Sequence, residues 1–282
     1  MAWQAYKVVL RLLTPLHVGA GQIGNLQRAR PYVTGKVLWG ALTARLTRDV
    51  SALGGDYVAV GRRVAGELAF SYFYPIAAGE TDVTVWPWGE TADEFAWRYL
   101  SSYAATALDY GQNTAADGSL HETEFIAPVT RDGEPVHLIG YVIERAGSAL
   151  PWQKALARLQ LGGERTYGWG RVGPVKLTPA DGCLFGQWAL RLDEAAPICS
   201  AADGARLLAH TWATGPQAVA GVTGSVEPLI GRETNQAQQH GELLAAAAIC
   251  WPPGSQAAGG LTVCIQEYGV WAGVAPLAGQ RV

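Results

Sequence analysis

Three glycines in the stretch HVGAGQIGN have the spacing G-x-G-x-x-G: Gly19, Gly21 and Gly24. In a Rossmann unit this spacing lets the backbone approach a dinucleotide pyrophosphate at the start of a helix. Here Pro31 follows instead, which disfavours helical geometry at the preceding residue, and the next carboxylate after the glycines is Asp49. Glycine is also abundant, at 35 of 282 residues, so the spacing alone carries little weight. We therefore predict no nucleotide cofactor, and no other cofactor is indicated.

Positive charge is concentrated around this stretch and around a second glycine-rich stretch at 162–170. Residues 1–50 contain seven Lys or Arg and one acid, a net charge of +6, and residues 151–176 carry a net +4. The whole chain has a formal net charge of −3, so the remaining residues carry −13. A mildly acidic protein with two basic segments fits a nucleic-acid ligand, although an ordinary solvated surface would show the same charges.

Acid–base chemistry has one serious candidate, His17. The chain has five histidines, and this one lies in the first glycine-rich stretch beside basic residues. A positioned imidazole can act as a general acid or base, but a histidine that only hydrogen-bonds RNA or backbone is the alternative. The four cysteines show no C-x-x-C spacing, so we expect separate thiols in a reducing compartment and no metal site.

These residues must be positioned by an α+β fold. The pattern of apolar residues predicts strands at 5–13, 66–76, 81–89, 122–130, 135–145 and 171–179, and helices at 35–50, 91–108 and 151–161. Thr34 is the expected N-cap of the first helix, and Leu38, Leu42 and Leu46 form its apolar stripe.

The hairpin signal Asp132-Gly133 predicts that 122–130 and 135–145 pair with each other. The polar segment 111–119 is expected to form the exposed tip of an insertion. The resulting order is βαββαβ, a ferredoxin-like (RRM-like) domain with glycine-rich loops and an inserted hairpin. Its two helices would cover one face of the sheet and leave the other face available, as in many RNA-binding modules.

Composition changes near residue 180, which predicts two domains, 1–180 and 181–282. The second is expected to be smaller and α+β or β-rich, with strands at 185–193 and 260–268 and a helix at 202–214. The longest apolar run, LLAAAAICW from residue 243, is far shorter than the roughly 20 residues that span a bilayer. We expect a soluble, cytoplasmic protein with no membrane partner.

Two stretches at matching places in this architecture resemble the RAMP superfamily of CRISPR effector complexes. They are TPLHVGAG with RARPYVTGKVLWGALTARL, which leads into the first helix, and RLQLGGERTYGWGRV, which leads into the last strand. The second is similar to the glycine-rich loop that marks the family, and EFIAPVT with PVHLIGYV resembles its middle hairpin. The resemblance covers about 1–178. It implies a single-stranded guide RNA (crRNA) as ligand, other CRISPR effector subunits as partners, and target nucleic acid engaged through the guide.

Physical chemistry supports RNA contacts at both loops. Residues without Cβ let backbone N–H groups approach phosphate, arginines offer bidentate phosphate contacts, and aromatic rings offer stacking planes. The predicted RNA-binding residues are His17, Gly19, Gly21, Gln22, Gly24, Arg28, Arg30, Lys36 and Arg45, together with Gly162, Gly163, Arg165, Tyr167, Gly168, Trp169, Gly170 and Arg171. A tight helix-to-strand turn is the alternative explanation of the second loop.

The family includes proteins that cut precursor guide RNA, proteins that form a repeated backbone along the guide, and proteins that cap its 5′ handle. In the cutting type the glycine-rich loop lies near the end of the chain, whereas here more than 100 residues follow it. The backbone type would need an acidic residue on a protruding segment, and Asp109, Asp117 and Glu122 are candidates without a distinguishing signal. The resemblance therefore favours a non-catalytic 5′-handle cap. The alternatives are the backbone role, a metal-independent ribonuclease that uses His17, and a ferredoxin-like enzyme unrelated to RNA.

Overall fold

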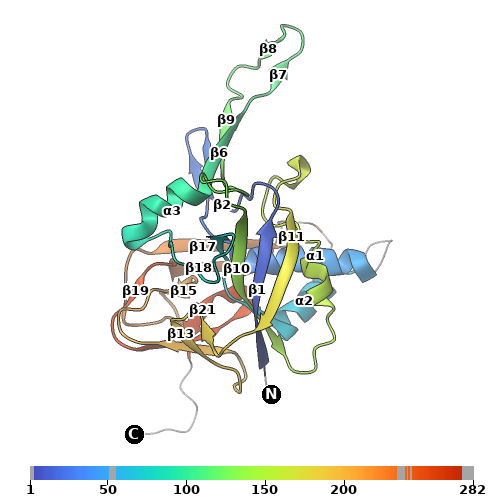
Figure 1. The fold of residues 1–282 in the computed structure, drawn as a ribbon. Coiled ribbons are helices and arrows are strands. Elements are labelled where there is room, and N and C mark those ends of the chain that lie inside the picture. The colour runs from blue at the N-terminus through green and yellow to red at the C-terminus, as the bar shows by residue number, and fades with distance from the viewer. Residues whose placement is uncertain (1–2, 51–54, 234–238, 240, 242, 275–282) are drawn as a thin grey trace.

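An antiparallel five-stranded sheet from the first two thirds of the chain is the framework of the fold (Figure 1). The computed structural model describes residues 3–50, 55–233, 239, 241 and 243–274. The strands of this sheet are β1 (Trp3–Leu12), β4 (Leu68–Phe70), β5 (Tyr74–Ala77), β10 (Val136–Arg145) and β11 (Val172–Pro179). They are arranged in the order β11-β1-β10-β4, and β5 also pairs with β10.

Helices cover one face of this sheet. They are α1 (Gly35–Val50), α2 (Tyr57–Glu67) and α4 (Trp152–Leu156). Even-numbered positions of β1 and β10, such as Leu10 and Leu138, point into this core, where Leu38, Leu42 and Leu46 of α1 meet them. The predicted apolar stripe is thus confirmed, and α1 begins directly after Thr34 as predicted. The helix α2, whose first turn is capped by the Asp56 side chain, was not predicted, and α4 is shorter than the predicted 151–161.

The opposite face of the sheet is buried, which corrects the prediction that it is available. Odd-numbered positions such as Ala5, Ile139 and Tyr141 form a second core with residues of the C-terminal segment, among them Trp188 and Trp271. That segment forms an eight-stranded sheet in the order β12-β13-β14-β20-β21-β15-β18-β17. Because β10 has apolar side chains on both faces, either face of the sheet could be buried. The C-terminal sheet covers the face opposite the helices.

The strands of the C-terminal sheet are short apart from β17 and β18. They are β12 (Cys183–Leu184), β13 (Trp188–Arg191), β14 (Ile198–Ala201), β15 (Thr211–Trp212), β17 (Glu227–Glu233), β18 (Leu243–Trp251), β20 (Leu261–Ile265) and β21 (Trp271–Gly273), with the small pair β16 (Val222–Thr223) and β19 (Gln256–Ala257) beside them. The strands predicted at 185–193 and 260–268 are confirmed. The helix predicted at 202–214 is wrong, because Leu207, Leu208 and Ala209 are buried consecutively rather than along one helical face. The division at residue 180 stays a prediction.

A separate four-stranded sheet, the arm sheet, carries an arm that projects from the body (Figure 1). Its strands are β2 (Gly19–Ile23), β3 (Leu26–Ala29), β9 (His121–Ile126) and β6 (Leu100–Ala105), and the small pair β7 (Leu108–Asp109) and β8 (Thr114–Ala115) lies at the end of the arm. The segment 111–119 is the exposed tip, as predicted.

Three predictions in this region differ from the structure. The helix predicted at 91–108 is only α3 (Ala92–Tyr99), preceded by the short 3-10 helix η1 (Gly89–Thr91), because Tyr103 leaves the Phe95–Tyr99 stripe and pairs with Thr123 across β6 and β9. The strands at 122–130 and 135–145 are joined by the predicted turn and pair next to it, at the bridge between Val129 and Pro135 and through the hydrogen bond from the Val136 N–H to the Pro128 oxygen. Farther from the turn they do not pair, since β9 belongs to the arm sheet and β10 to the first sheet. The strand predicted at 81–89 is also wrong, since the described backbone there has no strand.

Among the described residues, no helix combines the length and the apolar character that crossing a bilayer requires. The same part of the chain contains no group of three or more His, Cys, Asp or Glu side chains that could hold a metal ion. The four cysteines are free thiols, and Cys199 and Cys250 are buried.

Candidate nucleic-acid interface

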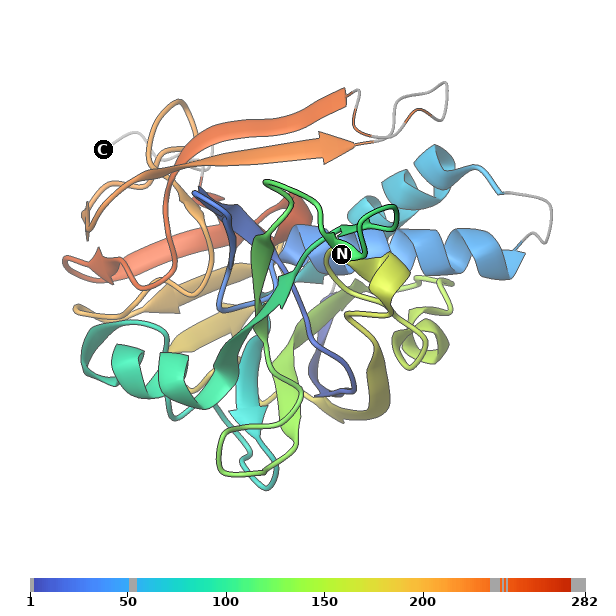
Figure 2. The same cartoon turned by 90° about the horizontal axis from the view of Figure 1, so that it is seen from above.

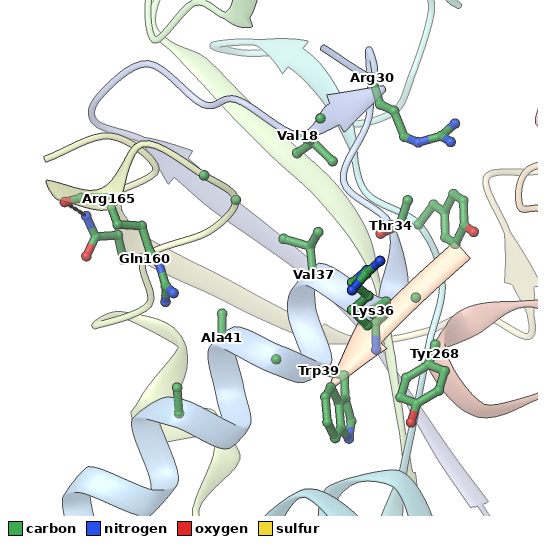
Figure 3. A pocket seen from close by; sticks show the side chains of 18 of the residues that line it. Val18, Arg30, Thr34, Lys36, Val37, Trp39, Ala41, Gln160, Arg165 and Tyr268 are labelled. Carbon is green, nitrogen blue, oxygen red and sulfur yellow. Dashed lines mark hydrogen bonds between the residues drawn. The ribbon is translucent and has the colours of Figure 1, made fainter. Parts of the chain in front are cut away.

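A groove of about 580 Å³ lies where the two glycine-rich stretches, α1 and β17 meet (Figure 3). Seen from above in Figure 2, the β17–β18 hairpin (orange) runs beside α1 and α2 (blue). Five cationic residues line the groove: Arg30, Lys36, Arg48, Arg165 and Arg232. Among the described residues that line it, none is Asp or Glu. A concave surface of one charge sign focuses its field and attracts the opposite charge, so this groove is suited to a polyanion.

Backbone hydrogen bonds hold the two glycine-rich stretches together. The N–H of Gly163 donates to the carbonyl oxygen of His17 at 2.8 Å, and the N–H of Gly170 donates to that of Pro15 at 2.7 Å. These approaches leave no space for side chains. A Cβ on Gly162 would lie 2.2 Å from the His17 oxygen, and one on Gly170 would lie 1.8 Å from the Leu161 oxygen. Both glycines also have positive φ, so these two positions require glycine for architecture.

His17 lies behind the groove rather than within it. Its side chain is buried, and its ring Nδ1 lies 2.7 Å from the carbonyl oxygen of Glu124 in β9. Because a carbonyl only accepts, Nδ1 carries a hydrogen and donates it. The His17 backbone carbonyl accepts from the second loop at the same time. His17 therefore links the first glycine-rich stretch, the arm sheet and the second glycine-rich stretch.

Arg30 enters the groove from a buried polar cluster. Its Nη1 donates to Oε1 of Glu227 at 2.7 Å and lies 3.3 Å from the hydroxyl of Tyr32. Oε1 of Glu227 also lies 2.5 Å from Nε2 of His210, whose Nδ1 is 2.7 Å from the hydroxyl of Tyr72. His210 is fully buried. The cluster joins Arg30 and Tyr32, which follow β3, and Tyr72, which lies between β4 and β5, to two residues of the C-terminal segment.

Lys36 lies at the start of α1 between aromatic rings. Its Nζ is 4.3 Å from the ring centre of Tyr268, which belongs to the 3-10 helix η3 (Glu267–Gly269), and 5.1 Å from that of Trp39. Cation–π contacts of this kind orient the lysine side chain. Gly231 of β17 packs on its stem, since a Cβ there would lie 2.9 Å from Cε of Lys36. Figure 3 shows these groups at the end of the groove opposite Gln160 and Arg165.

The first glycine-rich stretch is a β-hairpin and not the loop that we predicted. Gly19 lies on β2 and lines the groove. Gly24 is at the hairpin turn, where its carbonyl accepts from the Gln22 side chain at 2.9 Å, and Gly21 lies at a register shift between β2 and β3. Gly21, Gln22 and Gly24 do not line the groove. The G-x-G-x-x-G spacing thus serves a hairpin.

Two further predicted cations lie outside the groove. Arg28 pairs with Glu124 at 3.1 Å, and Arg45 pairs with Asp49 at 2.5 Å one helical turn along α1. A pairing carboxylate offsets their attraction for phosphate. Their predicted RNA contacts stay predictions, but the groove does not include them.

The second glycine-rich stretch contributes Gly162, Gly163 and Arg165 to the groove. Arg165 begins the 3-10 helix η2 (Arg165–Tyr167), and its carbonyl accepts from the Gln160 side chain at 3.0 Å. The other predicted residues of this stretch, Tyr167, Gly168, Trp169, Gly170 and Arg171, do not line it.

The two aromatic residues of this stretch differ in environment. The Tyr167 side chain is 74% exposed, whereas Trp169 packs edge-on against Phe125 with 5.1 Å between ring centres. Of these two residues, Tyr167 therefore offers the open stacking surface, and this surface lies outside the groove.

Sequence analysis missed Arg48, Arg232 and Tyr268 as groove residues. Arg48 had a signal, because it lies off the apolar stripe of α1. Arg232 and Tyr268 had none, since nothing in the sequence indicates that the C-terminal segment folds back over α1. Of the predicted residues, the structure brings together Gly19, Arg30, Lys36, Gly162, Gly163 and Arg165.

Comparison with known proteins assigns this architecture. The model of the RAMP superfamily matches residues 9–173, more than half of the chain. The chain belongs to the RAMP superfamily. The matched region begins in β1, includes both glycine-rich stretches and ends in β11, so it contains every groove residue outside the C-terminal segment. No curated protein matches the RAMP chain described here.

The fold of this RAMP protein is similar to that of solved chains. One comes from the cryo-EM structure of the Type III-B Cmr-beta bound to cognate target RNA and AMPPnP; it is 12% identical, with a TM-score of 0.51, and the match covers 89% of this chain and 85% of that one. A chain from the Type III-B Cmr-beta bound to cognate target RNA is 13% identical, with a TM-score of 0.40 and coverage of 62% and 96%. At 12% identity the likeness to the first of these chains concerns the fold alone.

Proposed function

We propose that this RAMP protein is a non-catalytic subunit of a CRISPR ribonucleoprotein effector and binds single-stranded guide RNA in the groove. The observation that carries the proposal is the gathering of five cationic residues on a concave surface built by both glycine-rich stretches, with no acidic residue among the described residues that line it. Phosphate contacts from Lys and Arg supply most of the affinity for a nucleic-acid backbone.

Family and fold support the same function. The RAMP match and the likeness to a chain of a target-RNA-bound Type III-B assembly favour an effector component. The sheet order β11-β1-β10-β4, with helical connections after β1 and β10, supports a ferredoxin-like arrangement of 1–180. Within this proposal the protein caps the 5′ handle of the crRNA in the cytoplasm, contacts neighbouring effector subunits and meets target RNA only through the guide.

The environment of His17 supports binding rather than cleavage. A general acid or base must reach the proton that it transfers, whereas the His17 side chain is buried and does not line the groove. In the part of the chain that the structure describes, no residue lining the groove is a histidine, aspartate or glutamate. The cationic side chains can hold phosphate but provide no acid–base pair.

The test is a titration of a fluorescent repeat-derived single-stranded RNA against the full chain at several salt concentrations. Contacts to about three to five phosphates predict a log–log salt slope of roughly −2 to −4. Arg48→Ala and Arg165→Ala should each weaken binding and flatten the slope by about 0.7. Arg191→Ala on β13, an exposed cation outside the groove, is the matched control.

Failure is clear in this design. A flat salt response, or equal losses for the groove variants and Arg191→Ala, would overturn RNA binding in the groove. Incubation of the same RNA with the protein, with and without divalent metal, tests catalysis. Cleavage that His17→Ala abolishes would replace the binding function by the ribonuclease alternative.

A further inference from the structure

Two residues of the C-terminal segment hold a groove cation without lining the groove themselves. His210 and Glu227 are absent from the groove wall, whereas Arg30, which both approach, is part of it. We propose that His210 and Glu227 are positioning residues: they fix the Arg30 guanidinium so that it presents its remaining N–H groups to an RNA phosphate. This inference rests on the RNA-binding function proposed above.

The hydrogen-bond pattern has one consistent assignment. The Glu227 carboxylate only accepts, so Nε2 of His210 carries a hydrogen and donates to it. Nδ1 of a neutral ring then accepts from the Tyr72 hydroxyl. Arg30 donates to the same Glu227 oxygen. The chain of donors therefore runs from Tyr72 through His210 to Glu227, where Arg30 meets it.

Charges around the cluster agree with this assignment. Burial lowers the pKa of His210 below its ordinary 6.5, and Arg30 lowers it further, so the ring is neutral near pH 7. The hydrogen bond from His210 lowers the pKa of Glu227 to about 2, and Arg30 contributes to the same shift. The hydroxyls of Tyr32 and Tyr72 and the thiol of Cys250 are the other titratable groups that face the cluster. At neutral pH the cluster thus contains one cation and one anion.

This arrangement leaves Arg30 able to bind. A guanidinium has five N–H donors, and only Nη1 is engaged within the cluster. Its side chain is 15% exposed, toward the groove. A long side chain held in one rotamer loses less entropy when it meets a ligand. Glu227 therefore has two opposite effects, because it orients Arg30 and also repels phosphate.

The sign of one substitution separates these effects. Glu227→Gln removes a negative charge near an anion site, so charge alone predicts tighter RNA binding. Positioning predicts weaker binding, because a neutral amide oxygen accepts from Arg30 and His210 more weakly than the charged carboxylate oxygen does. We expect Glu227→Gln to weaken binding of the fluorescent single-stranded RNA about three- to tenfold, against about tenfold for Arg30→Ala.

A double-mutant cycle completes the test in the full chain. His210→Phe should weaken binding by a similar factor in the native background, but it should have almost no further effect when it is added to Arg30→Ala. Adding Arg48→Ala, the matched control, should lower affinity by its full separate factor. His210→Gln, which retains an N–H donor near the position of Nε2, should restore most of the affinity, and this distinguishes positioning from a general packing role.

Each outcome has one meaning. Tighter binding by Glu227→Gln, or full additivity of His210→Phe with Arg30→Ala, would overturn the positioning inference and leave RNA binding in place. If Arg48→Ala and Arg165→Ala leave affinity unchanged, the groove does not bind RNA and both proposals fall. If His210→Phe does not fold, the cycle between Glu227→Gln and Arg30→Ala decides alone.

Discussion

The pair Gly162→Ala and Gly168→Ala separates glycines that the architecture requires from those that only adopt an unusual backbone angle. Both residues lie in the second glycine-rich stretch with positive φ, 72° and 82°. A Cβ on Gly168 would have no neighbour within 4 Å, whereas one on Gly162 would lie 2.2 Å from the carbonyl oxygen of His17. Both substitutions therefore impose the same backbone strain, but only Gly162→Ala places a Cβ against the His17 carbonyl oxygen.

The expected costs follow from these contacts. Left-handed geometry costs an alanine about 1–2 kcal/mol at either position. At Gly162 the His17 carbonyl must also move, which breaks the 2.8 Å hydrogen bond from Gly163 and adds about 1–3 kcal/mol. Both alanines restrict the unfolded chain equally, by about 0.4–1 kcal/mol, so this gain cancels in the comparison. We expect Gly162→Ala to be the less stable variant by about 1–3 kcal/mol.

Urea unfolding followed by tryptophan fluorescence measures this difference, with thermal melts as a check. For a chain of this size, each kcal/mol corresponds to about 2–4 °C in the melting temperature. The folded fraction of Gly168→Ala should bind RNA with unchanged affinity, since Gly168 does not line the groove. Equal stabilities of the two variants would refute the reasoning, because the close approach of the two loops would then impose no cost.

Three further predictions concern other parts of the molecule. The free energy of unfolding should fall with acidification below about pH 6.5, because His210 takes up a proton more readily in the unfolded chain than in the folded one. It should fall again from about pH 4.5 toward 2, because Glu227 takes up a proton more readily in the unfolded chain. In urea unfolding across this pH range, Glu227→Gln should flatten the lower part of the profile, and an unchanged profile would contradict the assignment. His17→Ala should lower the melting temperature by several degrees without changing RNA integrity, since it removes a buried hydrogen bond to Glu124; a near-native melt would show that His17 does not join the loops. Trp169→Ala should destabilise the protein by about 2–4 kcal/mol, because the Trp169 ring packs on Phe125. Tyr167→Ala should change stability by less than about 0.5 kcal/mol, because Tyr167 is exposed. Equal effects of the two substitutions in chemical denaturation would contradict these environments.

The sequence permitted local predictions wherever a pattern was complete within one element. The stripe of Leu38, Leu42 and Leu46 and the N-cap position of Thr34 located α1 correctly, and the alternation of apolar residues located β1, β10 and β11. The segment 91–108 failed because Phe95, Tyr99 and Tyr103 continue a helical spacing, although Tyr103 is in a strand. Spacing cannot detect the pairing of β6 with β9, which depends on residues far along the chain.

The groove shows the same limit. Charge and glycine content identified both stretches and three of the five cations that line it, Arg30, Lys36 and Arg165. The contribution of β17 could not be predicted, because Arg232 and Glu227 are separated from Arg30 by about 200 residues of sequence. The pairing of Arg28 and Arg45 with carboxylates likewise depends on tertiary contacts that composition does not record.

The groove is assembled from three distant parts of the chain: the first hairpin with α1, the second glycine-rich stretch, and β17 with η3. During synthesis the first two emerge well before the third, and domains fold as their sequence becomes available. A nascent or truncated chain would therefore present both glycine-rich stretches without the wall that completes the site. If the groove binds RNA as proposed, affinity for RNA reports complete folding, and RNA would select completely folded subunits. Because a ligand that binds only the completely folded form also stabilises it by mass action, RNA binding and completion of the fold would then reinforce each other.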